Sequence, residues 1–203
     1  MKILLVFATL FFSFLSCEEP LKNKNTDTKK LVVDTTIDSY GKILAKREQT
    51  SAEKQTDNLG TLINTISFNE KTNNKKDFEE GIIPWVSIED PNKDLHNLIG
   101  GNVTVIHDTN VTVIIDYPLT QQYQFEMTSK NGFTRENLLK EIRKRYYKIY
   151  AEEEESATVK TVPVDKRTTM YNRNETNGKY GIWGHDIGDL VLAEILVYKD
   201  TKG

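Results

Sequence analysis

The residues best suited to chemistry lie in one glycine-rich segment near the C-terminus, residues 171–189, which reads YNRNETNGKYGIWGHDIGD. His185 with Asp186 or Asp189 combines an imidazole with a carboxylate, the pair that many hydrolases use for acid–base chemistry. The same residues are ligands that several divalent metals accept. A metal site needs a further cluster of ligands and a hydrolase needs a nucleophile, and the sequence offers neither motif. We therefore expect no metal and no cofactor, and we treat these three residues as candidate catalytic groups.

Two aromatic residues of the same segment, Tyr180 and Trp183, are candidates for binding another molecule. Large aromatic side chains are frequent anchors in protein interfaces. Together with His185 they form the candidate binding face. The alternative is that Trp183 fills the hydrophobic core, where tryptophan buries a large apolar area.

The position of the two other histidines, His96 and His107, distinguishes an enzyme from a binding protein. A concave pocket that gathers His185 with either of them would favour an enzyme, because acid–base chemistry needs groups that meet in space. A flat aromatic surface would favour a binding protein.

The elements that must position this segment are a long helix and a final strand. Thr134 is a favourable N-cap, and the apolar residues after it repeat at helical spacing as far as residue 155. Residues 189–198 are apolar on both faces, which is typical of a strand in the interior of a sheet.

Alternating patterns predict further strands before the helix. Residues 102–107 and 111–117 have the pattern of a hairpin, and residues 122–127 alternate as a third strand. Strands followed by a helix and a last strand predict an α+β domain, with a mostly antiparallel sheet and one long helix packed on a face.

The N-terminus carries a second distinctive pattern. Lys2 precedes an apolar run over residues 3–15 that is too short to span a membrane, and Ser16 precedes Cys17, the only cysteine. This order resembles the signal of bacterial lipoproteins, which is cleaved before a cysteine that becomes lipid-modified. The resemblance implies that residues 1–16 are removed and that acyl chains such as palmitate on Cys17 hold the protein on a membrane of the cell envelope.

The segment between this signal and the domain is expected to be mostly flexible. Residues 17–77 are rich in Lys, Asn and Thr, which offer little surface to bury, so we assign them to a tether that begins with the lipidated cysteine. Two groups of apolar residues within it have helical spacing and predict short helices. They are Ile37, Tyr40, Ile43 and Leu44, and Leu59, Leu62, Ile63 and Ile66. A single globular domain then covers residues 78–203.

The net charge of −3 gives no electrostatic basis for binding nucleic acid, so we expect no such partner. Residues 181–190, GIWGHDIGDL, resemble a signature of an uncharacterised bacterial family, and that resemblance implies no particular activity. The sequence predicts a membrane-anchored binding or interaction module of the cell envelope with a protein partner. The alternative is an envelope enzyme, hydrolase-like and with or without a metal, that uses His185 with Asp186 or Asp189.

Overall fold

The computed structural model describes residues 2–6, 35–53, 59–89, 95–167 and 173–199. Most of the predicted signal and residues 17–34 of the predicted tether, Cys17 among them, lie outside the described residues. Within the described residues, no helix combines the length and the apolar character needed to span a membrane.

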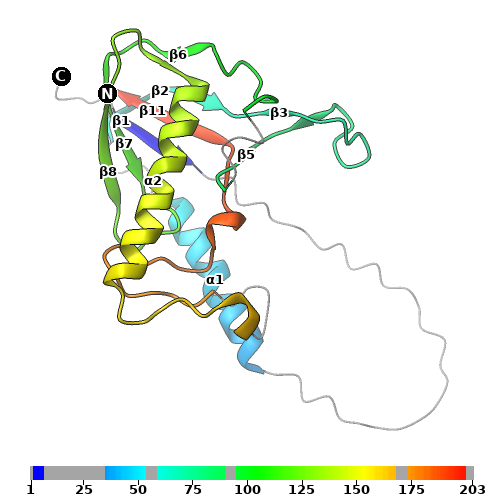
Figure 1. Ribbon diagram of the computed structural model, residues 1–203, viewed down its shortest axis with the longest axis vertical. Coiled ribbons are helices and arrows are strands. Elements are labelled where there is room, and N and C mark those ends of the chain that lie inside the picture. Colours follow the sequence, from blue (N-terminus) through cyan, green and yellow to red (C-terminus); the bar gives the residue numbers. More distant parts are fainter. Residues whose placement is uncertain (1, 7–34, 54–58, 90–94, 168–172, 200–203) are drawn as a thin grey trace.

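A five-stranded sheet forms the centre of the molecule (Figure 1). In spatial order its strands are β2 (Thr61–Ser67), β11 (Glu194–Lys199), β1 (Lys2–Val6), β7 (Asn110–Ile115) and β8 (Tyr123–Thr128). All neighbours pair antiparallel except β1 and β7, which are parallel. β11 has a partner on each side, as expected from its two apolar faces. The single strand predicted over residues 189–198 is wrong in its first half, because Val191–Leu192 form a separate strand, β10, in another sheet.

The long helix α2 (Arg135–Ser156) covers one face of this sheet (Figure 1). Thr134 caps it, because its side-chain oxygen accepts a hydrogen bond from the backbone N–H of Asn137. Apolar residues at helical spacing on α2 pack with every second residue of β7 to form the core. These residues are Leu138, Leu139, Ile142, Tyr146 and Ile149, and Val111, Val113 and Ile115. The predicted α+β class is confirmed.

Three two-stranded sheets surround the central one. They pair β3 (Glu70–Lys71) with β4 (Ile82–Ile83), β5 (Val86–Ser87) with β10 (Val191–Leu192), and β6 (Thr104–Ile106) with β9 (Phe133–Thr134). The predicted hairpin of residues 102–107 with 111–117 is therefore wrong. β6 pairs with β9, the strand just before α2, whereas β7 pairs with β8 and β1. Alternation identified both strands but carries no information on their partners.

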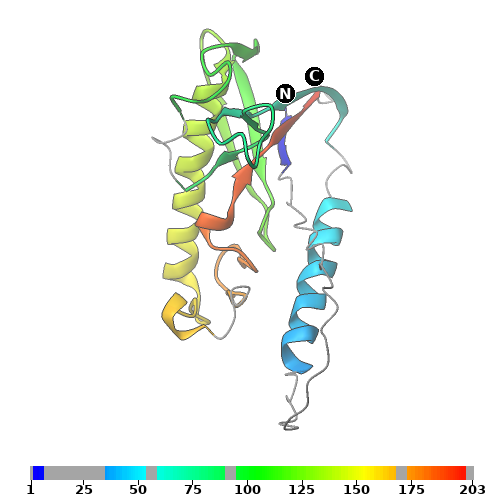
Figure 2. The same cartoon turned by 90° about the vertical axis from the view of Figure 1, so that its right-hand side faces the viewer.

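The folded part of the chain reaches further toward the N-terminus than the expected start at residue 78. β2 pairs with β11, and Ile66 and the following Phe68 are buried in the core. The helix predicted around residues 59–66 is wrong, because the β-branched residues of TLINTIS satisfy a strand that has a partner to pair with. The other predicted short helix is confirmed, because its apolar residues, from Ile37 to Leu44, lie in α1 (Thr35–Glu53). Figure 2 shows α1 and α2 on opposite sides of the sheet.

β1 lies within residues 1–16, the segment that we expect to be removed as a signal. In the structure it separates β11 from β7, so the central sheet of the whole chain includes part of that segment. Two 3₁₀ helices, η2 (Val164–Lys166) and η3 (Ile187–Asp189), complete the described elements, and η3 ends the glycine-rich segment.

Candidate functional site

The glycine-rich segment is held against the C-terminal end of α2 by one buried carboxylate. Glu153 is only 1% exposed and accepts hydrogen bonds from the backbone N–H groups of Gly178 (2.8 Å), Tyr180 (2.7 Å) and Gly181 (3.1 Å). Burial opposes ionisation of this carboxyl, but the hydrogen bonds from Thr176 and the three amides outweigh it and lower the pKa of Glu153. An ionised Glu153 therefore fixes the middle of the segment, residues 178–181.

Two of the glycines are required by close approach rather than by chemistry. A Cβ atom at Gly178 would lie 2.7 Å from the carbonyl oxygen of Glu153 and from Oγ of Ser156, which leaves no room for a side chain. Gly184 has a φ of 68°, and a Cβ there would lie 3.1 Å from Leu44 of α1. The segment thus passes between α2 and α1.

The predicted binding residues are mostly buried. Tyr180 is 4% exposed and Trp183 is 3% exposed, so they do not form a flat aromatic surface. The Trp183 ring packs edge-on against Tyr117 with centroids 5.3 Å apart, and the guanidinium of Arg47 from α1 lies 5.4 Å from its centroid. His185 is partly exposed and has its ring 5.8 Å from Trp183. The three residues share one region, in which the two aromatic side chains contribute to the core.

His185 takes part in a three-residue cluster that joins α1 to the domain. Its Nε2 lies 2.7 Å from Oε1 of Glu48 on α1 and 2.8 Å from the hydroxyl oxygen of Tyr117, which follows β7. The Tyr117 hydroxyl donates to the same Glu48 oxygen over 2.9 Å. This geometry suits the tautomer with the proton on Nε2, since both donors then point at the carboxylate. Burial, and next the charge of Glu48, raise the pKa of Tyr117 far above its ordinary value, so it acts as a donor.

The two predicted carboxylate partners of His185 are used elsewhere. Asp186 forms ion pairs with Arg167 and with Arg173. Burial opposes its ionisation, but the bonds to Arg167 outweigh that effect and lower the pKa of Asp186. Asp189 accepts a hydrogen bond from the backbone N–H of Asp186 and so caps η3. The carboxylate that orients the imidazole is Glu48.

The other histidines lie at the opposite end of α2. His107 lies against Gly132 just before β9, beside the start of the helix, whereas the carbonyl of His185 accepts a hydrogen bond from Tyr150. Sixteen residues of helix separate Thr134 from Tyr150, which is about 24 Å. His96 lies near the same start, four residues before Gly100, which faces Arg135. The structure therefore does not bring either histidine to His185.

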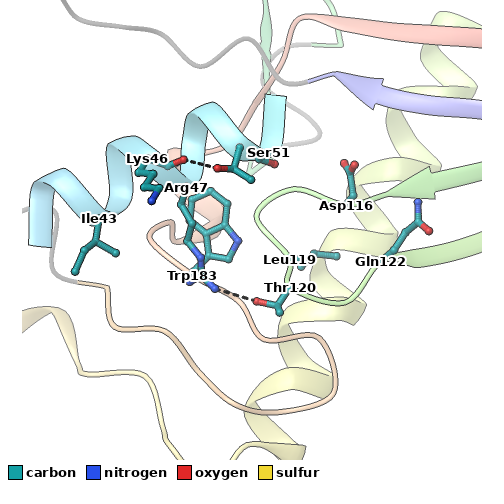
Figure 3. A pocket seen from close by; sticks show the side chains of 10 residues that line it. Ile43, Lys46, Arg47, Ser51, Asp116, Leu119, Thr120, Gln122 and Trp183 are labelled. Carbon is teal, nitrogen blue, oxygen red and sulfur yellow. Dashed lines mark hydrogen bonds between the residues drawn. The ribbon is translucent and has the colours of Figure 1, made fainter. Parts of the chain in front are cut away.

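A cavity of 510 Å³ opens beside this cluster, between α1 and the domain. Figure 3 shows Lys46 and Arg47 on α1 at one wall, and Asp116 and Gln122 on the other. Its ten lining residues are Ile43, Lys46, Arg47, Thr50, Ser51, Asp116, Leu119, Thr120, Gln122 and Trp183. Among the candidate residues from the sequence, only Trp183 reaches this cavity.

The sequence did not predict the roles of three residues in this region. They are Glu48, Asp116 and Glu153, and the last of them is a buried carboxylate that holds backbone N–H groups in place. Glu48 lies in the segment assigned to the tether, and the only sequence signal for it is the helical spacing around Leu44. Asp116 follows the apolar strand β7 directly, a position that many exposed residues share.

Within the described ranges, no three His, Cys, Asp or Glu side chains come together in a geometry that holds a metal ion. No family model, curated protein or solved structure matches this chain. The function therefore has to be argued from the geometry of this region and from the sequence.

Proposed function

We propose that this protein is a lipoprotein of a bacterial cell envelope whose domain binds another molecule in the cavity between α1 and the residues that connect β7 to β8. The observation that carries the proposal is the cavity itself, 510 Å³ in volume and lined by both apolar and charged side chains. Ligand sites in proteins are usually concave and combine a largely apolar lining with a few placed polar groups.

The part of the expected tether that precedes α1, residues 17–34, supports this proposal. A domain held to a membrane by a lipid and a flexible segment can reach a range of positions near the surface. The same arrangement suits a protein partner in the envelope or a small molecule, because either can meet the open cavity.

Site-specific photo-crosslinking in intact cells tests the binding role. A photoreactive amino acid replaces Gln122, which is exposed and lines the cavity, and in a control it replaces Lys144, which is exposed on α2. We expect an adduct, detected by mass spectrometry of the purified protein, from position 122 and not from position 144. Equal labelling at both positions, or none at position 122, would contradict a binding site at this cavity.

The lipid anchor is tested separately by metabolic labelling with a fatty-acid analogue. Cys17→Ser removes the predicted acceptor, so the label should be lost and the protein should leave the membrane fraction. Unchanged labelling of the variant would refute the anchor and leave the binding site untouched.

A second candidate function, an envelope hydrolase, is favoured by one observation, the 2.7 Å contact of Glu48 with His185. A carboxylate that orients an imidazole is part of many nucleophilic active sites. In this hydrolase, Glu48 takes the role of the carboxylate partner of His185, which the sequence assigned to Asp186 or Asp189. It predicts turnover of an ester, amide or phosphate substrate that His185→Gln abolishes. A screen of such substrates without turnover by the native protein would exclude it.

A further inference from the structure

Side chains of opposite charge line the two walls of the cavity. Lys46 extends from α1, and Asp116 lies on the opposite wall (Figure 3). Neither side chain forms an ion pair with any of the described residues. The neighbouring Arg47 is already paired with Glu175 at 2.7 Å, so Lys46 is the cation that remains available at this wall.

Asp116 is poorly accommodated without a ligand. Its Oδ1 atom is buried and has no hydrogen-bond partner among the described residues. A buried acceptor without a partner is unfavourable, and such groups in native proteins call for a specific explanation. Burial raises the pKa of Asp116 to about 6, which shows the same lack of stabilisation of the charged form. A cation bound in the cavity, which Asp116 lines, would stabilise the charged form of this carboxylate.

The surface between the two charges is mixed. Ile43, Leu119 and Trp183 provide apolar contact, while Gln122 and the hydroxyl of Ser51 offer hydrogen-bonding groups. A molecule that fills this space therefore needs an apolar part and polar groups between a positive and a negative end. A free amino acid carries both charges next to one carbon atom, whereas a short peptide carries them at opposite ends.

We infer that the cavity binds a short peptide with free termini, whose ammonium group meets Asp116 and whose carboxylate meets Lys46. This inference deepens the proposed function and rests on it, because it names the class of molecule that the same cavity takes. Backbone amides of the peptide lie near Gln122, and one apolar side chain contacts Trp183 and Leu119.

Calorimetric titration of the native protein, purified from membranes in detergent, tests this inference with defined probes. The probes are the tripeptide Ala-Leu-Ala, its N-acetyl form, its C-terminal amide and free leucine. We expect the tripeptide to bind, and each blocked form to bind at least about tenfold more weakly, as the loss of one charge-assisted contact implies. Free leucine should bind more weakly than the tripeptide.

Two variants assign each end of the peptide to its wall. Asp116→Asn should weaken binding of the tripeptide about tenfold and remove the difference between the free and N-acetylated forms. Lys46→Gln should remove the difference between the carboxylate and amide forms. Lys130→Gln, an exposed lysine outside the cavity, and Asp108→Asn, an exposed aspartate, are the matched controls and should bind as the native protein does.

Failure of the inference differs from failure of the proposed function. An adduct at position 122 together with no tripeptide binding, or with binding that ignores N-acetylation, would overturn the peptide ligand and keep the binding site. No adduct and no tripeptide binding would overturn both. The comparison of free and blocked peptides uses the native protein, so it tests the inference even if a variant does not fold.

Discussion

Glu153 holds the middle of the glycine-rich segment in place. It is buried, ionised and bonded to three backbone N–H groups of that segment. We expect Glu153→Gln to lower the free energy of unfolding by about 3 kcal/mol, because an amide replaces a charged acceptor and places a donor against backbone donors. Denaturant unfolding measures this, with exposed Glu155→Gln as a control that should change stability by less than about 0.5 kcal/mol.

The same residue predicts a pH dependence with a definite sign. The folded-state pKa of Glu153 is lower than its ordinary value of 4.5, so its contribution to stability is fully present above that value. The contribution is lost as the pH falls below 4.5 and through the folded-state pKa. The stability difference between the native protein and Glu153→Gln should therefore shrink as the pH is lowered from 7 to 3. A constant difference over that range would show that charge on Glu153 is not involved.

Asp116 predicts the opposite sign. Its pKa is raised from 3.8 to about 6, so the ionised form destabilises the folded state, and the penalty grows as the pH rises between these values. At pH 7.5 we expect Asp116→Asn to raise the free energy of unfolding by about 2 kcal/mol, and at pH 4 to leave it nearly unchanged. Asp108→Asn, in an exposed turn, should have no effect at either pH. If Asp116→Asn raises the free energy of unfolding at pH 7.5 and also weakens tripeptide binding, then Asp116 serves the ligand at the expense of stability.

Tripeptide binding should also follow the ionisation of Asp116. The charged groups that face it are Lys46 and Arg47 from α1, and Tyr146 faces it from α2. Burial raises the pKa of Tyr146 well above its ordinary value, so that phenol stays neutral. Affinity for the free-amine peptide should fall as the pH is lowered through about 6, because a protonated carboxyl no longer attracts the ammonium group. An affinity that is the same at pH 5 and pH 8 would contradict this contact.

Among the elements, α1 forms one wall of the cavity, and polar contacts hold it in place. Glu48 binds His185 and Tyr117, and Arg47 binds Glu175. We expect Glu48→Ala to increase hydrogen exchange of the α1 amides by about tenfold while α2 stays protected, because it removes charge-assisted contacts from α1 alone. Ala45→Gln, at an exposed position of the same helix, is the control. Unchanged exchange in Glu48→Ala would mean that the cluster does not dock the helix.

The elements with strong periodic patterns could be predicted from the sequence, and their partners could not. α2 and β11 were identified because their patterns are long and consistent. The spacing of the apolar residues of β2 fits a helix, and only the pairing of β2 with β11 decides between helix and strand. Strands that are neighbours in sequence usually pair, which predicts β6 beside β7, but the partner of β6 is β9.

The candidate site was predicted only in its C-terminal half. His185 and Trp183 stand out because glycines surround them. The contact of His185 with Glu48 spans 137 positions of the sequence, and no local pattern encodes such a distance. Asp186 and Asp189 are near His185 in sequence, but Asp186 pairs with Arg167 and Asp189 caps η3.

At the scale of the whole molecule, the predicted processing and the central sheet make one joint prediction. β1 pairs with β11 over residues 2–6 and with β7 over residues 2–4. A mature lipoprotein that begins at Cys17 lacks this strand, so the facing edges of β7 and β11 lose their backbone partners. Unpaired strand edges exchange their amides readily and attract other strands.

Hydrogen exchange on two chains tests this consequence directly. The first chain is the full-length Cys17→Ser protein produced without export, and the second begins at residue 18. We expect amides of β7 and β11 that face β1 to exchange at least about tenfold faster in the shorter chain, since each loses a backbone hydrogen bond. Amides between β11 and β2 are the internal control and should be equally protected in both. Equal exchange at β7 and β11 would mean that β1 adds nothing to the folded domain.

The mass of the native protein tests the predicted processing. Protein purified from membranes should have the mass of an acylated chain that begins at Cys17. A mass that still includes residues 1–16 would contradict the lipoprotein proposal and leave β1 as a permanent strand of the sheet.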